Sequence, residues 1–129
     1  MRGKDVLGAW GEQQAATWLQ QQGATVLARN WRCRAGEIDL VIAEGTCVAF
    51  VEVKTRRTAT FGPPQAAVDA RRQARLRRAA AAWLADHADH PELRPAPGRN
   101  GPDVRFDVVT VRPAADGEPV RVLHIPGAF

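Results

Sequence analysis

Apolar residues alternate with other residues in two neighbouring segments of the chain, around positions 38–42 and 48–54. A period of two is typical of β-strands that present one face to a protein core. The shared apolar face is formed by Ile38, Leu40, Ile42, Ala49, Val51 and Val53. The opposite face is apolar near the turn and charged at its far end, where it carries Glu37, Asp39, Glu52 and Lys54. The alternation therefore predicts two amphipathic strands with a charged end.

The pairing of these two strands through Glu44 and Gly45 is constrained by their apolar faces. A slip of one residue would turn every side chain to the other face, so the register must bring apolar face to apolar face. This requires a loop of even length or a bulge, and it places Asp39 opposite Glu52 or Phe50. Because directly opposed residues have Cβ atoms about 5 Å apart, Asp39 and Glu52 are predicted to reach one cation.

The rest of the chain predicts two helices and three more strands. Helices are expected over 5–22 and from 65 to about 87, strands over 24–28, 104–111 and 120–125, and loops over 30–36, 55–64 and 90–103. The loop at 90–103 is rich in proline and glycine and is expected to be mobile. The order of elements predicts an α/β fold, a single domain over residues 1–129 with a central mixed sheet of about five strands flanked by helices.

The composition adds an electrostatic expectation. The 129 residues carry a formal net charge of +4 at a sequence pI near 10.0, and arginine supplies most of the positive charge. Because the planar guanidinium binds phosphate in a bidentate manner, a nucleic acid is the expected partner. The chain has no apolar run of membrane-spanning length, no secretory leader and no disulfide or zinc spacing of its two cysteines, which predicts no membrane association and a cytoplasmic location.

Three carboxylates are candidate ligands of a divalent metal. Mg²⁺ is held in proteins by one or two carboxylates together with substrate phosphate, and Asp39 and Glu52 can supply those. Lys54, on the same face, can act on an attacking water or stabilise charge on the phosphate. Glu12 falls on a small-residue stripe of the first helix and is either a further ligand or the partner of an arginine. The alternative for the strand end is a solvated surface where Glu37 pairs with Lys54.

Arginines bracket the carboxylate strands and follow the second helix. Arg71, Arg75 and Arg78 fall in one line, which suits the tracking of a phosphate backbone but is also typical of a solvated helix face. The arginines that flank the two strands are Arg29, Arg32, Arg34, Arg56 and Arg57. Arg105 and Asp107 are expected to form an ion pair within the sheet and not to take part in catalysis.

The candidate residues resemble the signature of a nuclease superfamily. Asp39 followed by Glu52-Val53-Lys54 resembles the PD-(D/E)XK pattern, whose aspartate and E-x-K triplet lie on adjacent strands. Further blocks are similar to the YraN family of small bacterial proteins: GxWGEQxAxxWL at 8–19, RNWR at 29–32, GEIDLV at 36–41, FVEVKTR at 50–56, FGPPQAAV at 61–68 and RFDVV at 105–109. These blocks span nearly the whole chain, so the resemblance is specific.

The resemblance implies a restriction-endonuclease-like core, similar to that of Holliday-junction resolvases. It implies a metal-dependent endonuclease that hydrolyses phosphodiester bonds of DNA, with branched or flapped structures as substrates and Mg²⁺ or Mn²⁺ as the cofactor. The implied ligands are Asp39, Glu52 and Glu12, with Lys54 as the catalytic lysine. The residues expected to bind nucleic acid are Arg32, Arg34, Arg56, Arg71, Arg72 and Arg75.

Two departures and two alternatives accompany this resemblance. The superfamily signature has proline before the aspartate, whereas this chain has Ile38, and the YraN family shares this departure. Arg72 stands where the YraN family often has lysine. One alternative is a nucleic-acid-binding protein with a nuclease-like fold and little or no catalysis, and another is a protein-interaction subunit with an acidic partner. Junction resolvases act as dimers, so the resemblance also implies a homodimer.

Overall fold

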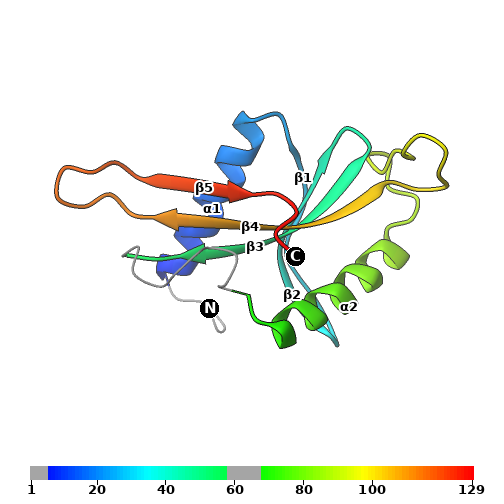
Figure 1. Cartoon of the computed structure of the whole chain (residues 1–129), viewed down its shortest axis with the longest axis horizontal. Coiled ribbons are helices and arrows are strands. Elements are labelled where there is room, and N and C mark those ends of the chain that lie inside the picture. Colours follow the sequence, from blue (N-terminus) through cyan, green and yellow to red (C-terminus); the bar gives the residue numbers. More distant parts are fainter. Residues whose placement is uncertain (1–5, 58–67) are drawn as a thin grey trace.

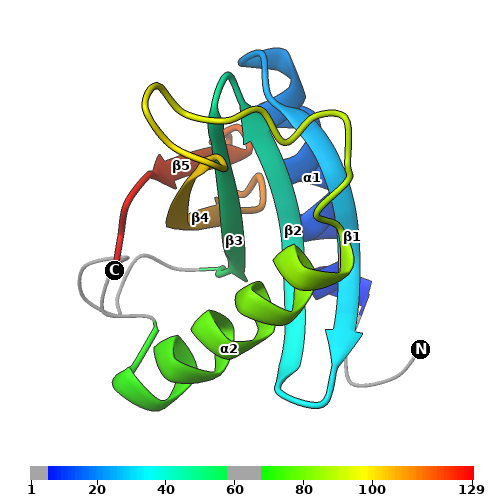
Figure 2. The same ribbon diagram turned by 90° about the vertical axis from the view of Figure 1, so that its right-hand side faces the viewer.

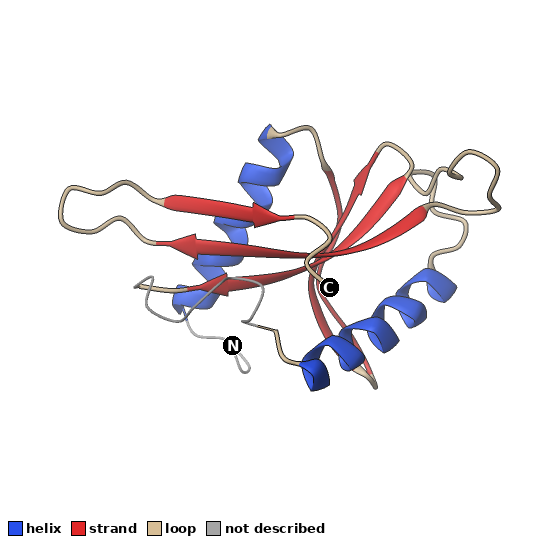
Figure 3. Cartoon of the chain, viewed as in Figure 1, coloured by secondary structure: helices blue, strands red, loops and turns tan. Residues whose placement is uncertain are grey.

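The computed structural model describes residues 6–57 and 68–129 as two helices and five strands (Figures 1 and 3). In chain order the elements are α1 (Val6–Gln21), β1 (Thr25–Cys33), β2 (Gly36–Glu44), β3 (Cys47–Thr55), α2 (Ala70–Asp86), β4 (Asp103–Arg112) and β5 (Arg121–Ile125). None of the described helices has both the length and the apolar character needed to cross a membrane.

The strands form one mixed sheet in the order β1-β2-β3-β4-β5. Neighbouring strands are antiparallel except β3 and β4, which are parallel because α2 lies between them in the chain. The two helices cover opposite faces of the sheet, with α1 behind it and α2 in front in Figure 2. This α/β architecture is the predicted one and is consistent with a restriction-endonuclease-like core.

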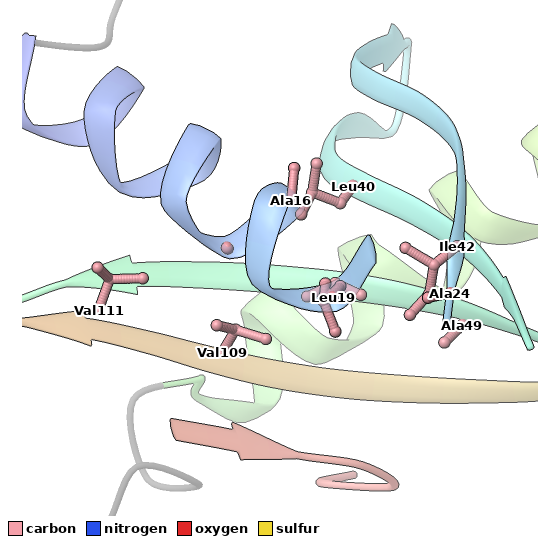
Figure 4. Packing of buried hydrophobic residues seen from close by; sticks show 10 residues of the cluster. Ala16, Leu19, Ala24, Leu40, Ile42, Ala49, Val109 and Val111 are labelled. Carbon is pink, nitrogen blue, oxygen red and sulfur yellow. The ribbon is translucent and has the colours of Figure 1, made fainter. Parts of the chain in front are cut away.

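The predicted apolar face packs against α1. Ala16 and Leu19 of the helix face Leu40 and Ile42 of β2 and Val109 of β4, and all five side chains are buried (Figure 4). The opposite face of β3 packs with Trp83 of α2 in a second cluster, whose strand members are Ile38, Val41, Val48, Phe50 and Phe106. The burial of apolar side chains on both faces is what holds the two helices to the sheet.

Ile38 was predicted to share the face of Leu40, and this is wrong. It packs in the α2 cluster, together with its register partner Trp31. The ladder between β2 and β3 extends only as far as Leu40 and Val51. Beyond that point β2 pairs with β1 alone, so the twist of this two-stranded ribbon carries Ile38 toward α2.

The sheet forks where that ladder ends. The β1–β2 ladder continues to Gly36, and the parallel β3–β4 ladder continues to Thr55, so each half of the sheet keeps its own pairing. Figure 1 shows β2 and β3 diverging from each other at this end. We call the gap between residues 36–39 of β2 and 52–55 of β3 the fork. It brings the charged ends of both strands together at an opening in the sheet.

Two predicted boundaries differ from the structure. The loop expected over 30–36 is wrong over most of its length, because β1 continues to Cys33 as an edge strand whose arginines are exposed to water. The second helix was expected from 65, whereas Asp69 caps it by accepting a hydrogen bond from the backbone N–H of Arg72 at 2.8 Å, and α2 begins at Ala70. Positions 5 and 58–67 of the predicted elements lie outside the described residues.

A close contact between α1 and β3 predicts the effect of a small substitution. A Cβ added at Gly11 would overlap the side chain of Thr55, which lies 3.0 Å away at its own Cβ. We expect Gly11→Ala to lower the free energy of unfolding by about 1–3 kcal/mol, measured by urea denaturation, because the helix must move away from the fork. Thr55→Ala in the same chain should restore most of that loss.

The matched control is Gly101→Ala, since an added Cβ there meets no atom within 4 Å. It should leave the free energy of unfolding within about 0.5 kcal/mol of the wild-type value. Equal stability of the Gly11→Ala and Gly101→Ala variants would contradict the close packing of α1 on β3.

Candidate functional site

A cavity of about 690 Å³ opens at the fork. Its lining comes from α1, the ends of β1, β2 and β3, and the first turn of α2. The lining residues are Leu7, Gly8, Glu12, Arg32, Cys33, Gly36, Glu37, Asp39, Glu52, Val53, Lys54, Thr55 and Arg72. All four predicted catalytic residues and two of the predicted nucleic-acid-binding arginines therefore border one space.

The predicted parity of the β2–β3 hairpin is confirmed. Leu40 pairs with Val51, and Glu44 pairs with Cys47 across a loop of Gly45 and Thr46. Gly45 adopts a φ of 59°, which glycine tolerates without the steric cost that a Cβ would bring. Continuing this register would bring Asp39 opposite Glu52, but the strands separate first.

Asp39 replaces the missing strand pairing with its side chain. Its Oδ2 accepts a hydrogen bond from the backbone N–H of Val53 at 2.9 Å, so the carboxylate lies in the gap between β2 and β3. Asp39 is 5% exposed and Glu52 is 3% exposed. This burial disagrees with the alternative of a solvated strand end, because buried carboxylates require compensating partners.

Glu52 is held by two cations. Its Oε1 accepts from Nη2 of Arg72 at 2.9 Å, and its Oε2 lies 3.3 Å from Nζ of Lys54. Arg72 reaches the fork because it precedes Leu76 by one helical turn and so shares the inward side of α2 with Leu76 and Trp83. Arg72 was predicted only as one of the nucleic-acid-binding arginines, although this spacing from the apolar stripe was a signal that it faces the sheet.

The guanidinium of Arg72 lies in the field of several carboxylates. Burial lowers the pKa of Arg72, but the hydrogen bond to Glu52 and the charges of Glu52, Asp39 and Glu37 together raise this pKa above its ordinary value. Its Nε atom is buried and has no hydrogen-bond partner within the described residues. The Nη2 atom of Arg72 is thus bound to Glu52, while its Nε atom donates to no group within the described residues.

Glu12 approaches the cavity from α1. It is 9% exposed, and Ala15, Ala16 and Leu19, on the predicted small-residue stripe, are buried against the sheet. Glu37 also lines the cavity and accepts a hydrogen bond from Nε of Arg32 at 2.9 Å. Within residues 6–57 and 68–129, no three His, Cys, Asp or Glu side chains are grouped closely enough to hold a metal ion.

None of the other predicted arginines is among the described residues that line this cavity. Arg34 is exposed in the turn between β1 and β2, and Arg56 is partly buried directly after β3. Arg71 and Arg75 are exposed on α2, as expected for the outward stripe. Figure 2 shows α2 crossing in front of β2, and the first turn of this helix carries Arg72 into the cavity lining.

A second buried carboxylate, Asp107, belongs to a different network. It is fully buried on β4 and accepts hydrogen bonds from Nε and Nη2 of Arg105, both at 2.8 Å, from Nε2 of His124 at 2.7 Å and from the backbone N–H of Gly127 at 3.0 Å. Arg105 also donates to Glu44 at 2.6 Å. The predicted Arg105–Asp107 ion pair is confirmed, whereas the partners His124 and Glu44 were not predicted.

The chain matches the model of one protein family and several whole proteins. The model described as "Uncharacterised protein family UPF0102" matches residues 11–111. A UPF0102 protein of Frankia alni is 49% identical over 129 residues, which cover 100% of this chain and 98% of that protein. One from Frankia casuarinae is 49% identical with 100% of both chains covered. A UPF0102 protein of Mycolicibacterium vanbaalenii is 47% identical over 121 residues, or 94% of this chain and 91% of that protein.

Proposed function

This chain belongs to the uncharacterised protein family UPF0102, and we propose that it is a metal-dependent endonuclease that acts on DNA. Family membership agrees with the YraN-like blocks of the sequence. The observation that carries the proposal is the arrangement of two buried carboxylates, Asp39 and Glu52, with Lys54 in one cavity, which two arginines also line. We include in this proposal the placement of the chain in the PD-(D/E)XK superfamily, because these residues lie on adjacent strands.

The donor set of the cavity fits a hard divalent cation. Asp39, Glu52 and Glu12 offer only oxygen atoms, and Mg²⁺ or Mn²⁺ needs one or two carboxylates together with water and substrate phosphate. A cation bound there would polarise the phosphoryl group and lower the pKa of a bound water. Buried carboxylates concentrate negative charge in a site of low polarity, which favours a cation over water.

The chain's own residues would hold and activate the substrate. Lys54 lies beside Glu52 at the mouth of the fork, where its ammonium can orient the attacking water or stabilise charge that develops on the phosphate. Arg32 lines the same cavity and can bind the phosphate next to the scissile bond. The exposed arginines Arg71 and Arg75 can hold the flanking backbone.

A cleavage assay tests this function. We expect the purified protein to cut end-labelled flap or four-way junction DNA in Mg²⁺ or Mn²⁺ and to stop in EDTA. Asp39→Asn should reduce the single-turnover rate by about 10- to 100-fold, because one hard ligand is lost while Glu52 is kept. Asp103→Asn, which changes an aspartate on β4 outside the cavity lining, is the matched control and should retain the wild-type rate.

The alternative of a DNA-binding protein without turnover is favoured by one observation, the engagement of Glu52 by two cations of the chain itself. It predicts salt-dependent binding of the same substrates with no product in either metal. Binding without cleavage on flap, junction and linear DNA would therefore replace the endonuclease by this second function.

A further inference from the structure

We propose that Arg72 is a displaceable cation, which competes with the metal for Glu52 and contacts the substrate phosphate once the metal has displaced it. The inference rests on the proposed function and concerns its regulation. It assigns to Arg72 a role at the metal-binding carboxylate, which the exposed arginines on the same helix do not share.

The contact geometry supports competition. Arg72 donates from Nη2 to Oε1 of Glu52 at 2.9 Å, while Lys54 lies 3.3 Å from the other oxygen. Both oxygens of Glu52 therefore face a positive group, which reduces the negative charge that Glu52 offers to a metal. Lys54 is a flexible point charge, whereas Arg72 fixes one oxygen with a directed hydrogen bond. Removal of Arg72 is thus the step that exposes Oε1.

The charges around Arg72 show why the guanidinium occupies this position. The carboxylates of Glu52, Asp39 and Glu37 all act on it, and two of these three carboxylates are proposed metal ligands. A guanidinium and a divalent cation therefore favour the same region of negative potential. Because the guanidinium and the metal compete for the same negative charge, each lowers the apparent affinity of the other.

The Nε donor of Arg72, which has no partner in the described part of the chain, indicates which group Arg72 binds after it leaves Glu52. Nε is buried without a partner in the described part of the chain, so the side-on edge of the guanidinium is only partly satisfied by Glu52. A phosphate offers two acceptor oxygens for that edge, which makes it a better partner than a carboxylate shared with Lys54. Release from Glu52 and binding to phosphate are then one movement of the same side chain.

The test measures metal binding and DNA binding separately, with Arg72→Met. If Arg72 leaves Glu52 about one-tenth of the time, wild-type affinity for the metal is reduced about tenfold, and the variant should bind Mn²⁺ about tenfold more tightly by isothermal titration calorimetry without DNA. In Ca²⁺, the variant should bind labelled flap DNA several-fold more weakly by fluorescence anisotropy, because a bidentate phosphate contact is lost. A merely structural role of Arg72 would weaken both affinities.

Two further variants make the outcome decisive. Arg75→Met removes the same charge from the exposed side of α2 and should change Mn²⁺ affinity less than about twofold, since exposed charges are screened by salt. Arg72→Gln keeps a hydrogen-bond donor for Glu52 but removes the positive charge, and it should also tighten Mn²⁺ binding. The competition can therefore be tested with this variant even if Arg72→Met does not fold.

Each outcome separates this inference from the proposed function. If the wild type binds Mn²⁺ and cleaves DNA but Arg72→Met binds Mn²⁺ no more tightly than Arg75→Met, the competition is overturned and the endonuclease stands. If neither the wild type nor the Arg72 variants bind Mn²⁺, both proposals fail. Tight Mn²⁺ binding by Arg72→Met together with no cleavage by the wild type would support the competition and overturn the endonuclease.

Discussion

Replacement of Lys54 by methionine is expected to reduce the single-turnover rate of DNA cleavage by about 10²- to 10³-fold, with Mn²⁺ affinity unchanged or increased. Lys54 is the one lysine among the described residues that line the cavity, and its Nζ lies 3.3 Å from Glu52. Methionine keeps much of the apolar stem but removes the charge and the donors. The loss should therefore fall on the chemical step, and the rate should be measured at saturating metal and DNA.

Lys54→Arg separates the two roles that the fork permits for Lys54. Arginine keeps the positive charge but does not give up its proton, so it can stabilise charge on the phosphate without serving as a base. Retention of a substantial part of the wild-type rate would assign charge stabilisation, and a rate as low as that of Lys54→Met would assign action on the attacking water. Cleavage by Lys54→Met within about threefold of the wild type would contradict a catalytic role for this residue.

The strands that carry the proposed site could be predicted because their information is local. The alternation around Leu40 and Val51 and the glycine at position 45 together determine both the faces and the register of the β2–β3 hairpin. The hairpin alone therefore brings Asp39, Glu52 and Lys54 to one end of the sheet. Glu12 was also placed correctly beside the sheet, since helical spacing puts it in line with buried alanines.

The fork and its partners depended on contacts that are distant in the chain. Alternation does not reveal where two strands separate, so the hydrogen bond between Asp39 and the backbone of Val53 was not predicted. The rotation of α2 that brings Arg72 to Glu52 is set by the burial of Trp83 and its neighbours on that helix. β1 was predicted too short because an edge strand needs few buried side chains, and its arginines resemble those of a loop.

The network around Asp107 also depends on contacts that are distant in the chain. Its ion pair with Arg105 was predicted because both residues lie on one strand two positions apart, on the same face. His124 and the backbone of Gly127 come from β5 and the segment after it, so they join the network only when the last strand pairs with β4. The carboxylate therefore ties the C-terminal segment to the interior of the sheet.

We expect Asp107→Asn to lower the free energy of unfolding by about 3–5 kcal/mol, measured by urea denaturation near neutral pH. The substitution keeps the size of the side chain but removes the negative charge that faces Arg105 and His124, and it replaces one acceptor oxygen by an NH₂ group that cannot accept from these partly buried donors. Arg105 keeps its ion pair with Glu44 in this variant, so we expect the protein still to fold.

The pH dependence of the same variant tests the cause. Burial would raise the pKa of Asp107, but hydrogen bonds from His124, Arg105 and the backbone of Gly127 outweigh it and lower this pKa below the ordinary value. A carboxylate with a lowered folded-state pKa stabilises the protein above its unfolded-state pKa of about 3.9, and this contribution is lost as the pH falls through the folded-state value. The stability difference between wild type and Asp107→Asn should be constant above about pH 5 and shrink in acid.

Asp103→Asn is the matched control for the stability effect, because it makes the same chemical change on the same strand at an exposed ion pair with Arg99. Exposed pairs contribute about 0–1 kcal/mol, so this variant should unfold close to the wild type. Equal destabilisation by the two substitutions would show that the loss comes from asparagine on β4 rather than from the buried network. A stability difference for Asp107→Asn that persists unchanged into strong acid would exclude the charge of Asp107 as its origin.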